Sequence, residues 1–326
     1  MNQTALFKSS LSDDIQKFLN MKRALGYKYD DEEYILRLFD TYWIQHNGES
    51  QSATMDSLAE WVKQRPTEGK SFQYARVQLV KQLMEFRNSR GKLSYVPMDK
   101  IKCPKHPVIH VLNRDEIQAL FQGIDAFRPT RPTSETLRIS KEYPAALRLI
   151  ASTGLRRSEA ASILIQDIDF SCHIIMIRNA KGHKDRIISI SEDMSDLLKN
   201  YLCFLENAVQ GQIKWLFPSI NPIEHLNSAS LESIFNRAWM QTTYASTCAK
   251  KPTVHSLRHS FVVSRINSWI EQGIDTRVMM PYLSHHLGHK SPDETFYYYH
   301  QVQESLKAIH QMDQTSEAVI PEVRCR

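Results

Sequence analysis

Apolar residues recur every three or four positions through the first hundred residues of the chain, with polar residues between them. This spacing places the apolar side chains on one face of a helix. There are four such groups: Leu11, Ile15, Phe18, Leu19 and Leu25; Ile35, Leu38, Phe39 and Tyr42; Met55, Leu58, Trp61 and Val62; and Val77, Val80, Leu83 and Phe86. We therefore expect a small helical bundle with these residues turned inward.

A proline-containing stretch at about 102–112 interrupts this pattern. Pro104 and Pro107 favour an extended backbone over a helix. After them, Asn113 stands three residues before Glu116, which is the spacing of a capping box at a helix N-terminus. The stretch is therefore expected to be a linker, and a second domain is expected to begin near residue 113.

The second domain contains one change of period. Two β-branched runs, at 174–177 and 187–190, enclose a polar turn with Gly182, and this pattern predicts a β-hairpin. The other periodic segments are helical, namely 143–164 with a break at Gly154, and about 192–208, 229–241, 255–273, 276–287 and 293–311. The chain is thus predicted to be mainly α, with a helical N-terminal bundle and a mostly helical second domain that holds a small antiparallel sheet.

The expected domain bounds follow from these patterns. The helical bundle is expected at 1–106 and the second domain at 113–311, while the segment 312–326 lacks periodicity and is expected to be a flexible tail. A length of 326 residues exceeds what one hydrophobic core usually supports, which agrees with two domains.

The charge balance adds a preference for a polyanionic partner. The net charge is +5 and the pI is about 8.8, but only the placement of the basic residues makes this informative. They cluster among Ser, Thr and Asn residues, which can also reach phosphate oxygens. The clustered basic residues are Arg131, Arg156, Arg157, Lys181, Lys184, Arg186, Lys250 and Lys251.

The cysteines and the hydropathy of the chain argue against several other classes of protein. The five cysteines are scattered without a CxxC pair, so neither a disulfide framework nor a zinc site is expected. The start of the chain lacks a basic region followed by an apolar run, and no stretch approaches the roughly 18 apolar residues of a membrane span. We expect a soluble, cytoplasmic protein without a membrane partner.

Four short segments of the second domain carry chemistry-bearing residues in a fixed order. Each alone has an ordinary explanation, since an Arg near a helix start or a Lys in a turn is usually solvated and a Tyr among aromatics is usually packed in a core. The segments are Thr153-Gly154-Leu155-Arg156 with Glu159, the hairpin turn with Lys181, His255-Ser256-Leu257-Arg258, and Leu287-Gly288-His289 followed nine residues later by Tyr298.

Taken together, these segments resemble the tyrosine recombinase (phage integrase) family. That family carries an Arg in a TGLR-like segment, a Lys in a hairpin turn about twenty-five residues later, an HxxR motif, and an LGH motif followed by a Tyr that precedes x-His. The residues in these places are Arg156, Lys181, His255, Arg258, His289 and Tyr298. The resemblance covers essentially the whole second domain, whereas the first domain is similar only in kind, as a helical module that grips DNA.

The resemblance implies a site-specific recombinase or integrase that cleaves and rejoins DNA through a 3′-phosphotyrosyl intermediate. It implies double-stranded DNA as the partner, with specific recombination sites and four protomers in the synaptic complex, and it leaves a directionality factor open. Glu159 would support the site, and neither cofactor nor metal is implied. The helix after Tyr298, with Val302, Leu306 and Ile309, would pack either on a neighbouring protomer or on its own domain.

Elementary chemistry agrees with these roles. The charge that develops on a phosphodiester in transfer has to be met by fixed cations, and the planar fork of Arg matches phosphate oxygens. Arg156 and Arg258 would clamp the phosphate, His255 and His289 would donate hydrogen bonds or move protons, and Lys181 would protonate the leaving oxygen. With a phenol pKa near 10, only about 0.1% of Tyr298 is ionised at pH 7, so it needs activation.

Two assignments within the motifs have close neighbours. Tyr298 is preferred over Tyr297 and Tyr299 for its spacing from His289, and Arg156 over Arg157 because Glu159 then follows by one helical turn. Two departures from the family pattern put the strand geometry in doubt: Ala180 stands where Gly is frequent before the Lys, and Ser189 where Pro is common.

Three other functions stay open at this stage. The chain could be a catalytically inactive DNA-binding accessory protein of the same fold, or a type IB topoisomerase-like nicking-closing enzyme. A third interpretation treats the histidines of the last two motifs as a metal cluster, although no carboxylate joins them at ligand spacing. These histidines are His255, His259, His285, His286 and His289.

Overall fold

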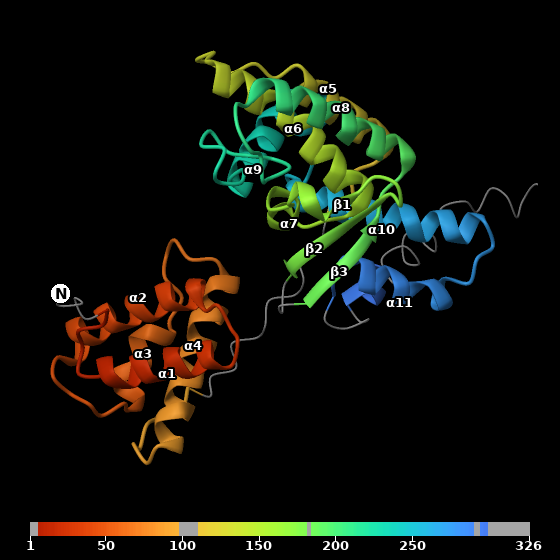
Figure 1. Cartoon of the computed structure of the whole chain (residues 1–326). Coiled ribbons are helices and arrows are strands. Elements are labelled where there is room, and N and C mark those ends of the chain that lie inside the picture. Colours follow the sequence, from red (N-terminus) through yellow and green to blue (C-terminus); the bar gives the residue numbers. More distant parts are fainter. Residues whose placement is uncertain (1–5, 98–109, 181–183, 290–293, 299–326) are drawn as a thin grey trace, which may run out of the picture. The chain divides into compact units, whose positions relative to one another are not determined.

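A computed structural model of the chain describes residues 6–97, 110–180, 184–289 and 294–298 (Figure 1). The chain divides into two compact units, Met1–Val108 and Ile109–Arg326. Most of the expected linker, the hairpin turn with Lys181, the helix expected after Tyr298 and the expected tail lie outside the described residues. Each unit is described by itself.

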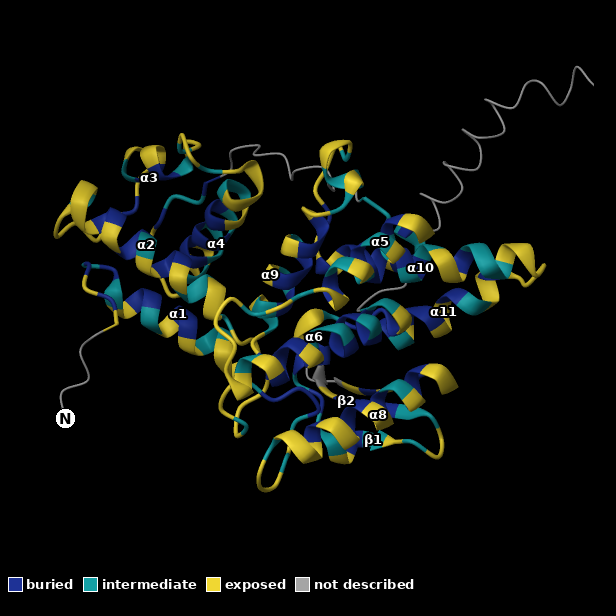
Figure 2. Ribbon diagram, turned by 90° about the horizontal axis from the view of Figure 1, so that it is seen from above, coloured by how far each residue is buried: buried dark blue, intermediate teal, exposed yellow. Residues whose placement is uncertain are grey.

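The first unit is the predicted helical bundle. Its helices are α1 (Ser12–Ala24), α2 (Asp30–Asn47), α3 (Met55–Val62) and α4 (Lys70–Ser89). Their shared core contains most of the apolar residues that the pattern selected, such as Phe18, Phe39, Trp61 and Leu83. Figure 2 shows buried and exposed residues alternating around these helices, as expected for amphipathic helices around one core.

Two residues of the predicted apolar faces are not in that core. The side chains of Leu25 and Met55 are 66% and 64% exposed. Leu25 is the residue that caps the C-terminus of α1, and Met55 is the first residue of α3. Both residues lie at helix ends, where the chain turns away from the core. The prediction that these two side chains face the core was therefore wrong.

The second unit holds the remaining helices, and none of the helices that the structure describes is long and apolar enough to cross a membrane. They are α5 (Arg114–Asp125), α6 (Ser134–Thr153), α7 (Arg157–Ala161), η1 (Ile165–Asp167), α8 (Glu192–Ala208), α9 (Ser228–Trp239), η2 (Thr243–Ser246), α10 (Val254–Glu271) and α11 (Thr276–Leu287), with a further helical turn at 294–298. α5 begins at the predicted capping box, in which Asn113 and Glu116 exchange hydrogen bonds of 2.9 and 2.8 Å.

Helix α6 lies at the centre of this unit and packs against α5, α7, α8, α9 and α10 (Figure 2). It begins at Ser134, earlier than the predicted start at residue 143, because Thr133 forms a capping box with Thr136. The first half of α6 buries a salt-bridged pair, Arg138 and Glu142, where an amphipathic helix usually carries apolar residues. The pattern of apolar residues therefore missed this half of the helix.

The predicted hairpin is present as part of a three-stranded antiparallel sheet in the order β1 (Ile168–Asp169), β2 (Ile174–Ala180), β3 (Lys184–Ser189). Ile175 lies opposite Ile188 in the β2–β3 ladder, and the register shifts between Ile177 and Ala180. The two residues that depart from the family pattern are both paired in the ladder. Ala180 pairs with Lys184, and Ser189 pairs with Ile174. α7 packs against β2 and α11 against β3, which brings the ends of both helices to the sheet.

The capping box of α5 allows a test of how the second unit begins. Replacing Asn113 by Ala removes the acceptor for the Glu116 N–H, so we expect Asn113→Ala to lower the free energy of unfolding by about 1 kcal/mol. Urea denaturation followed by circular dichroism measures this loss. Asn207→Ala, within α8 and exposed, is the control and should cost less; equal losses would contradict the capping role.

Candidate active site

Three arginines from distant parts of the chain meet at the C-terminal end of α11. The carbonyl oxygens of residues 286, 287 and 288 each accept a hydrogen bond from a different guanidinium group. Arg186 Nε lies 2.7 Å from the first oxygen, Arg258 Nη2 2.8 Å from the second, and Arg156 Nη2 3.1 Å from the third. Because the last carbonyls of a helix have no partner within it, they are free to fix these side chains.

Glycines at two positions make this meeting possible. Gly288 ends α11 in the left-handed conformation with φ +63°, and a Cβ atom there would lie 2.9 Å from Arg186 Nη1. Gly154 ends α6 with φ +68°, and its carbonyl accepts a hydrogen bond of 2.7 Å from Arg258 Nη1. A Cβ atom on Gly154 would lie 2.6 Å from the ring of Phe261. Both motifs therefore require glycine for backbone conformation and for space.

The carboxylate of Glu159 holds two of the arginines in place. It accepts two hydrogen bonds from Arg186, of 3.1 and 2.8 Å, and one of 2.8 Å from Arg156 Nη1. It also accepts from the backbone N–H of Arg156, at 3.0 Å. Burial alone would raise the pKa of Glu159, but the hydrogen bonds and charges of Arg186 and Arg156 outweigh it and lower that pKa to about 2. Glu159 is therefore ionised and orients both guanidinium groups.

The arginines carry more charge than Glu159 can neutralise. Three guanidinium groups and one carboxylate leave two positive charges in a site where Arg258 and Arg186 are buried. Burial, followed by the charge of Arg156, lowers the pKa of Arg258 to about 10, so it stays protonated at neutral pH. Such an excess of buried positive charge costs free energy, and an anion such as a phosphodiester would offset it.

His289 is neutral and fixed by both ring nitrogens. Nε2 lies 2.9 Å from Arg258 Nη2, and Nδ1 lies 2.6 Å from Thr295 Oγ1. Since a guanidinium group can only donate, we assign Nε2 as the acceptor and Nδ1–H as the donor to Thr295. Burial and then the charge of Arg258 lower the pKa of His289 to about 3, in agreement with this neutral form.

Tyr298 lies within the same site. Its ring is parallel to that of His289 with centroids 6.5 Å apart, and its hydroxyl oxygen lies 2.6 Å from His259 Nδ1. Burial raises the pKa of Tyr298 to about 12, although the positive charges of Arg258 and Arg156 act against this. The phenol is therefore protonated at neutral pH, close to the cations that could stabilise its anion.

His255 lies beside this group on α10. Its ring is 4.4 Å from that of His259, centroid to centroid and nearly perpendicular. The side chain reaches solvent at the rim of the site, and partial burial together with the charges of Arg258 and Arg156 lowers the pKa of His255. It is therefore placed to meet a ligand that enters from solvent.

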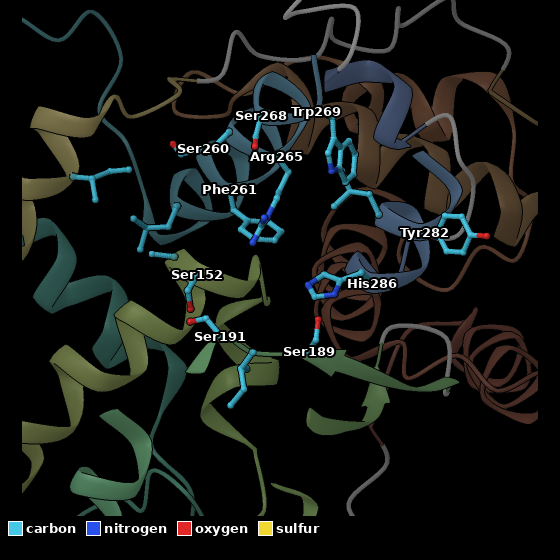
Figure 3. Close-up of a pocket in the computed structure, with 16 residues that line it drawn as sticks. Ser152, Ser189, Ser191, Ser260, Phe261, Arg265, Ser268, Trp269, Tyr282 and His286 are labelled. Carbon is cyan, nitrogen blue, oxygen red and sulfur yellow. The ribbon is translucent and has the colours of Figure 1, made fainter. Parts of the chain in front are cut away.

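A second face of helix α10 lines a cavity that is separate from the arginine site. Figure 3 shows Ser260, Phe261, Arg265, Ser268 and Trp269 of α10 pointing into a cavity of about 800 Å³, with side chains of α6, α11 and β3 on its other walls. These residues recur at helical spacing, whereas the site residues 255, 258 and 259 lie outside this lining. The cavity and the arginine site therefore occupy different faces of α10.

The structure thus brings together six of the seven site residues that the sequence suggested, and Lys181 lies outside the described residues. The six are Arg156, Glu159, His255, Arg258, His289 and Tyr298. The choice of Arg156 over its neighbour agrees with the geometry, because Arg157 lies 3.3 Å from Glu232 and 47% of its side chain is exposed. Among the described residues, no three His, Cys, Asp or Glu side chains gather as metal ligands.

Three residues of the site were missed in the sequence. Arg186 was grouped only with other basic residues, although it directly precedes the β-branched run of the predicted hairpin, where a charge could have been recognised as unusual. His259 was considered only as a metal ligand, although it directly follows Arg258 and stands one helical turn after His255. Thr295 carried no signal, because its contact with His289 depends on the fold.

Known proteins share this sequence pattern and fold. The model of the phage integrase family matches residues 110–305. An integrase/recombinase of Sinorhizobium fredii is 26% identical over 296 residues, which cover 89% of this chain and 92% of that protein. The tyrosine recombinase XerD of Rickettsia bellii is 26% identical over 284 residues, covering 83% and 86%.

Solved structures resemble this one at the level of the fold. The site-specific recombinase XerH in a post-cleavage complex with its palindromic difH substrate has a TM-score of 0.64 and 18% identity, over 93% of this chain and 84% of that one. A lambda integrase dimer bound to a COC′ core site has a TM-score of 0.59 and 17% identity, over 86% and 96%.

The paired carboxylate of Glu159 predicts a pH-dependent stability. Its pKa in the folded chain, about 2, lies below the ordinary value of 4.5, so its contribution is complete above about pH 4.5 and is lost as the pH falls towards 2. We expect Glu159→Gln to lower the free energy of unfolding by about 3 kcal/mol at pH 7, with the difference from the unsubstituted chain shrinking below pH 4.5. Urea titrations between pH 2 and 7 measure this, with exposed Glu206→Gln as the control; a constant difference would contradict the ion-pair explanation.

Proposed function

Because the chain belongs to the phage integrase family, we propose that it is a site-specific DNA recombinase that cleaves and rejoins strands through a covalent bond between Tyr298 and a 3′ phosphate. One observation carries this proposal: a buried phenol lies within a group of guanidinium cations whose charge is only partly neutralised. Phosphoryl transfer to a tyrosine needs both features in one place.

The scissile phosphate would bind where Arg156 and Arg258 converge. Each guanidinium group has five N–H donors in a planar fork, and the carbonyls near Gly288 hold each group by only part of that fork. The remaining donors would bind the non-bridging oxygens, with His255 at the rim as a further donor. Because these groups are already held by Glu159 and by the end of α11, little reorganisation is needed when charge develops on the phosphate.

Cleavage would proceed as an in-line displacement. The Tyr298 oxygen forms a bond to phosphorus, the bond from phosphorus to the 5′ oxygen breaks, and Lys181 gives a proton to that leaving oxygen. The phosphotyrosyl bond keeps the energy of the phosphodiester, so a 5′ hydroxyl can reverse the reaction and join a strand without ATP. None of these steps calls for a metal ion or an organic cofactor.

The partner that fits this chemistry is double-stranded DNA. Binding would rest on phosphate contacts from both units of the chain, which would close around the duplex, and would weaken as salt rises. Strand exchange by this chemistry joins two DNA sites, each bound by two protomers, so we propose a tetramer as the synaptic assembly. A directionality factor would act on this assembly rather than on the phosphate chemistry.

A nicked suicide substrate tests the proposal. We expect the unsubstituted chain to form a covalent protein–DNA adduct that is resolved by denaturing electrophoresis, and Tyr298→Phe to form none while binding the same DNA in a filter assay, because only the nucleophilic oxygen is lost. Tyr297→Phe is the matched control and should still form the adduct. DNA binding without an adduct by the unsubstituted chain would indicate an accessory protein instead, and relaxation of any supercoiled DNA by a monomer would indicate a topoisomerase-like enzyme.

The role of Lys181 can be separated from that of the nucleophile. If Lys181 protonates the leaving oxygen, Lys181→Ala should slow cleavage of ordinary DNA by roughly 10²-fold or more but should cleave a 5′-bridging phosphorothiolate substrate at nearly the unsubstituted rate, because sulfur leaves without a proton. Single-turnover rates on the two substrates measure this. Arg258→Ala, which is slowed on both substrates, is the control, and a failure of rescue would assign the acid to another group.

A further inference from the structure

We propose that His259 is the base that takes the phenolic proton of Tyr298 during attack on the phosphate. The inference rests on the proposed function and assigns the proton transfer from the nucleophile to a histidine outside the motif positions that the sequence analysis selected. A protonated phenol is a poor nucleophile, so its proton has to move to an acceptor within hydrogen-bond reach.

The geometry identifies the acceptor. The hydroxyl oxygen of Tyr298 lies 2.6 Å from Nδ1 of His259, and both side chains are buried, at 6% and 8% exposure. The two rings have centroids 5.2 Å apart and are tilted by 38°. His259 stands directly after Arg258 on α10, so the helix that supplies a phosphate-binding arginine also supplies the contact to the nucleophile.

The protonation states of the pair agree with a phenol that donates. Burial and then the charges of His255 and Arg258 lower the pKa of His259 to about 3, so its imidazole is neutral at physiological pH. Burial raises the pKa of Tyr298 to about 12, so its hydroxyl keeps its proton. A neutral imidazole has one nitrogen that accepts, and we assign this role to Nδ1, which accepts the Tyr298 O–H.

The other histidines of the site are directed elsewhere. Both ring nitrogens of His289 are engaged, with Arg258 and Thr295, so its parallel ring offers no acceptor to the phenol. His255 presents its ring to the ring of His259 at the rim of the site. Of these three imidazoles, His259 is the one whose nitrogen meets the reacting oxygen.

Binding of DNA would make His259 a stronger base. Nearby cations, among them Arg258 and Lys250, contribute to its low pKa. A phosphodiester between Arg156 and Arg258 brings a negative charge that offsets these cations, so the pKa of His259 rises towards its ordinary value. The proton then passes from the Tyr298 oxygen to Nδ1 as the oxygen–phosphorus bond forms, and it returns to the oxygen when a 5′ hydroxyl rejoins the strand.

Two substitutions separate proton transfer from positioning. His259→Asn keeps an amide group close to the place of Nδ1 and can still hold the phenol, but it cannot take a proton, whereas His259→Ala loses both functions. We expect both variants to bind DNA normally and to form the covalent adduct roughly 10²–10⁴-fold more slowly than the unsubstituted chain. His225→Asn is the matched control, because Nδ1 of His225 also makes a hydrogen bond, of 2.9 Å to the Leu226 carbonyl, in the same unit.

A more acidic phenol provides a readout that a structural role would not change. A fluorinated tyrosine incorporated at position 298 ionises more readily and needs a base less, so it should restore most of the adduct formation of His259→Asn. Single-turnover rates of adduct formation on the suicide substrate, with thermal melting to confirm folding, measure this rescue.

The outcomes are distinguishable. An unsubstituted rate in His259→Asn, or slow cleavage by that variant without rescue by the acidic phenol, would overturn the assignment of the base and leave the recombinase proposal standing. Absence of an adduct from the unsubstituted chain and from His225→Asn alike would overturn the recombinase proposal, and the base with it.

Discussion

The site depends on the contact between three guanidinium groups and three successive carbonyl oxygens at the end of α11. Like charges repel one another, and burying them together is unfavourable unless fixed dipoles face them. A helix C-terminus supplies such dipoles, because its last carbonyls are unpaired and its macrodipole is negative there. The arginines are thus held in defined positions, and the proposed function assigns their excess positive charge to the binding of a phosphate.

This contact also links the elements around it. Arg186 comes from β3, Arg156 precedes α7 and Arg258 lies on α10, so the sheet and two helices are joined to the end of α11. Glu159 adds a second connection between Arg186 and Arg156. Arg186 thereby anchors strand β3 to the end of α11.

The Tyr298 phenol is held in a protonated state within this positive environment. Burial outweighs the effect of the neighbouring cations and raises the pKa of this phenol to about 12, so it keeps its proton at neutral pH. Under the proposed function, a bound phosphate would instead act through His259, because its negative charge would raise the pKa of the imidazole that accepts the phenolic proton.

The sequence by itself determined most of the helices and strands and indicated most of the candidate site residues. The helical periods, the hairpin and the capping box at Asn113 are local patterns, which depend only on residues close together in the chain. The short motifs and their order along the chain selected Arg156, Arg258 and Tyr298. Only the tertiary structure decided the rest. The buried Arg138–Glu142 pair lies in a part of α6 that no apolar period indicated. Arg186 and His259 entered the site through contacts with residues up to 100 positions away. Spacing along a chain carries no information about such contacts, since they are set by how packed elements meet.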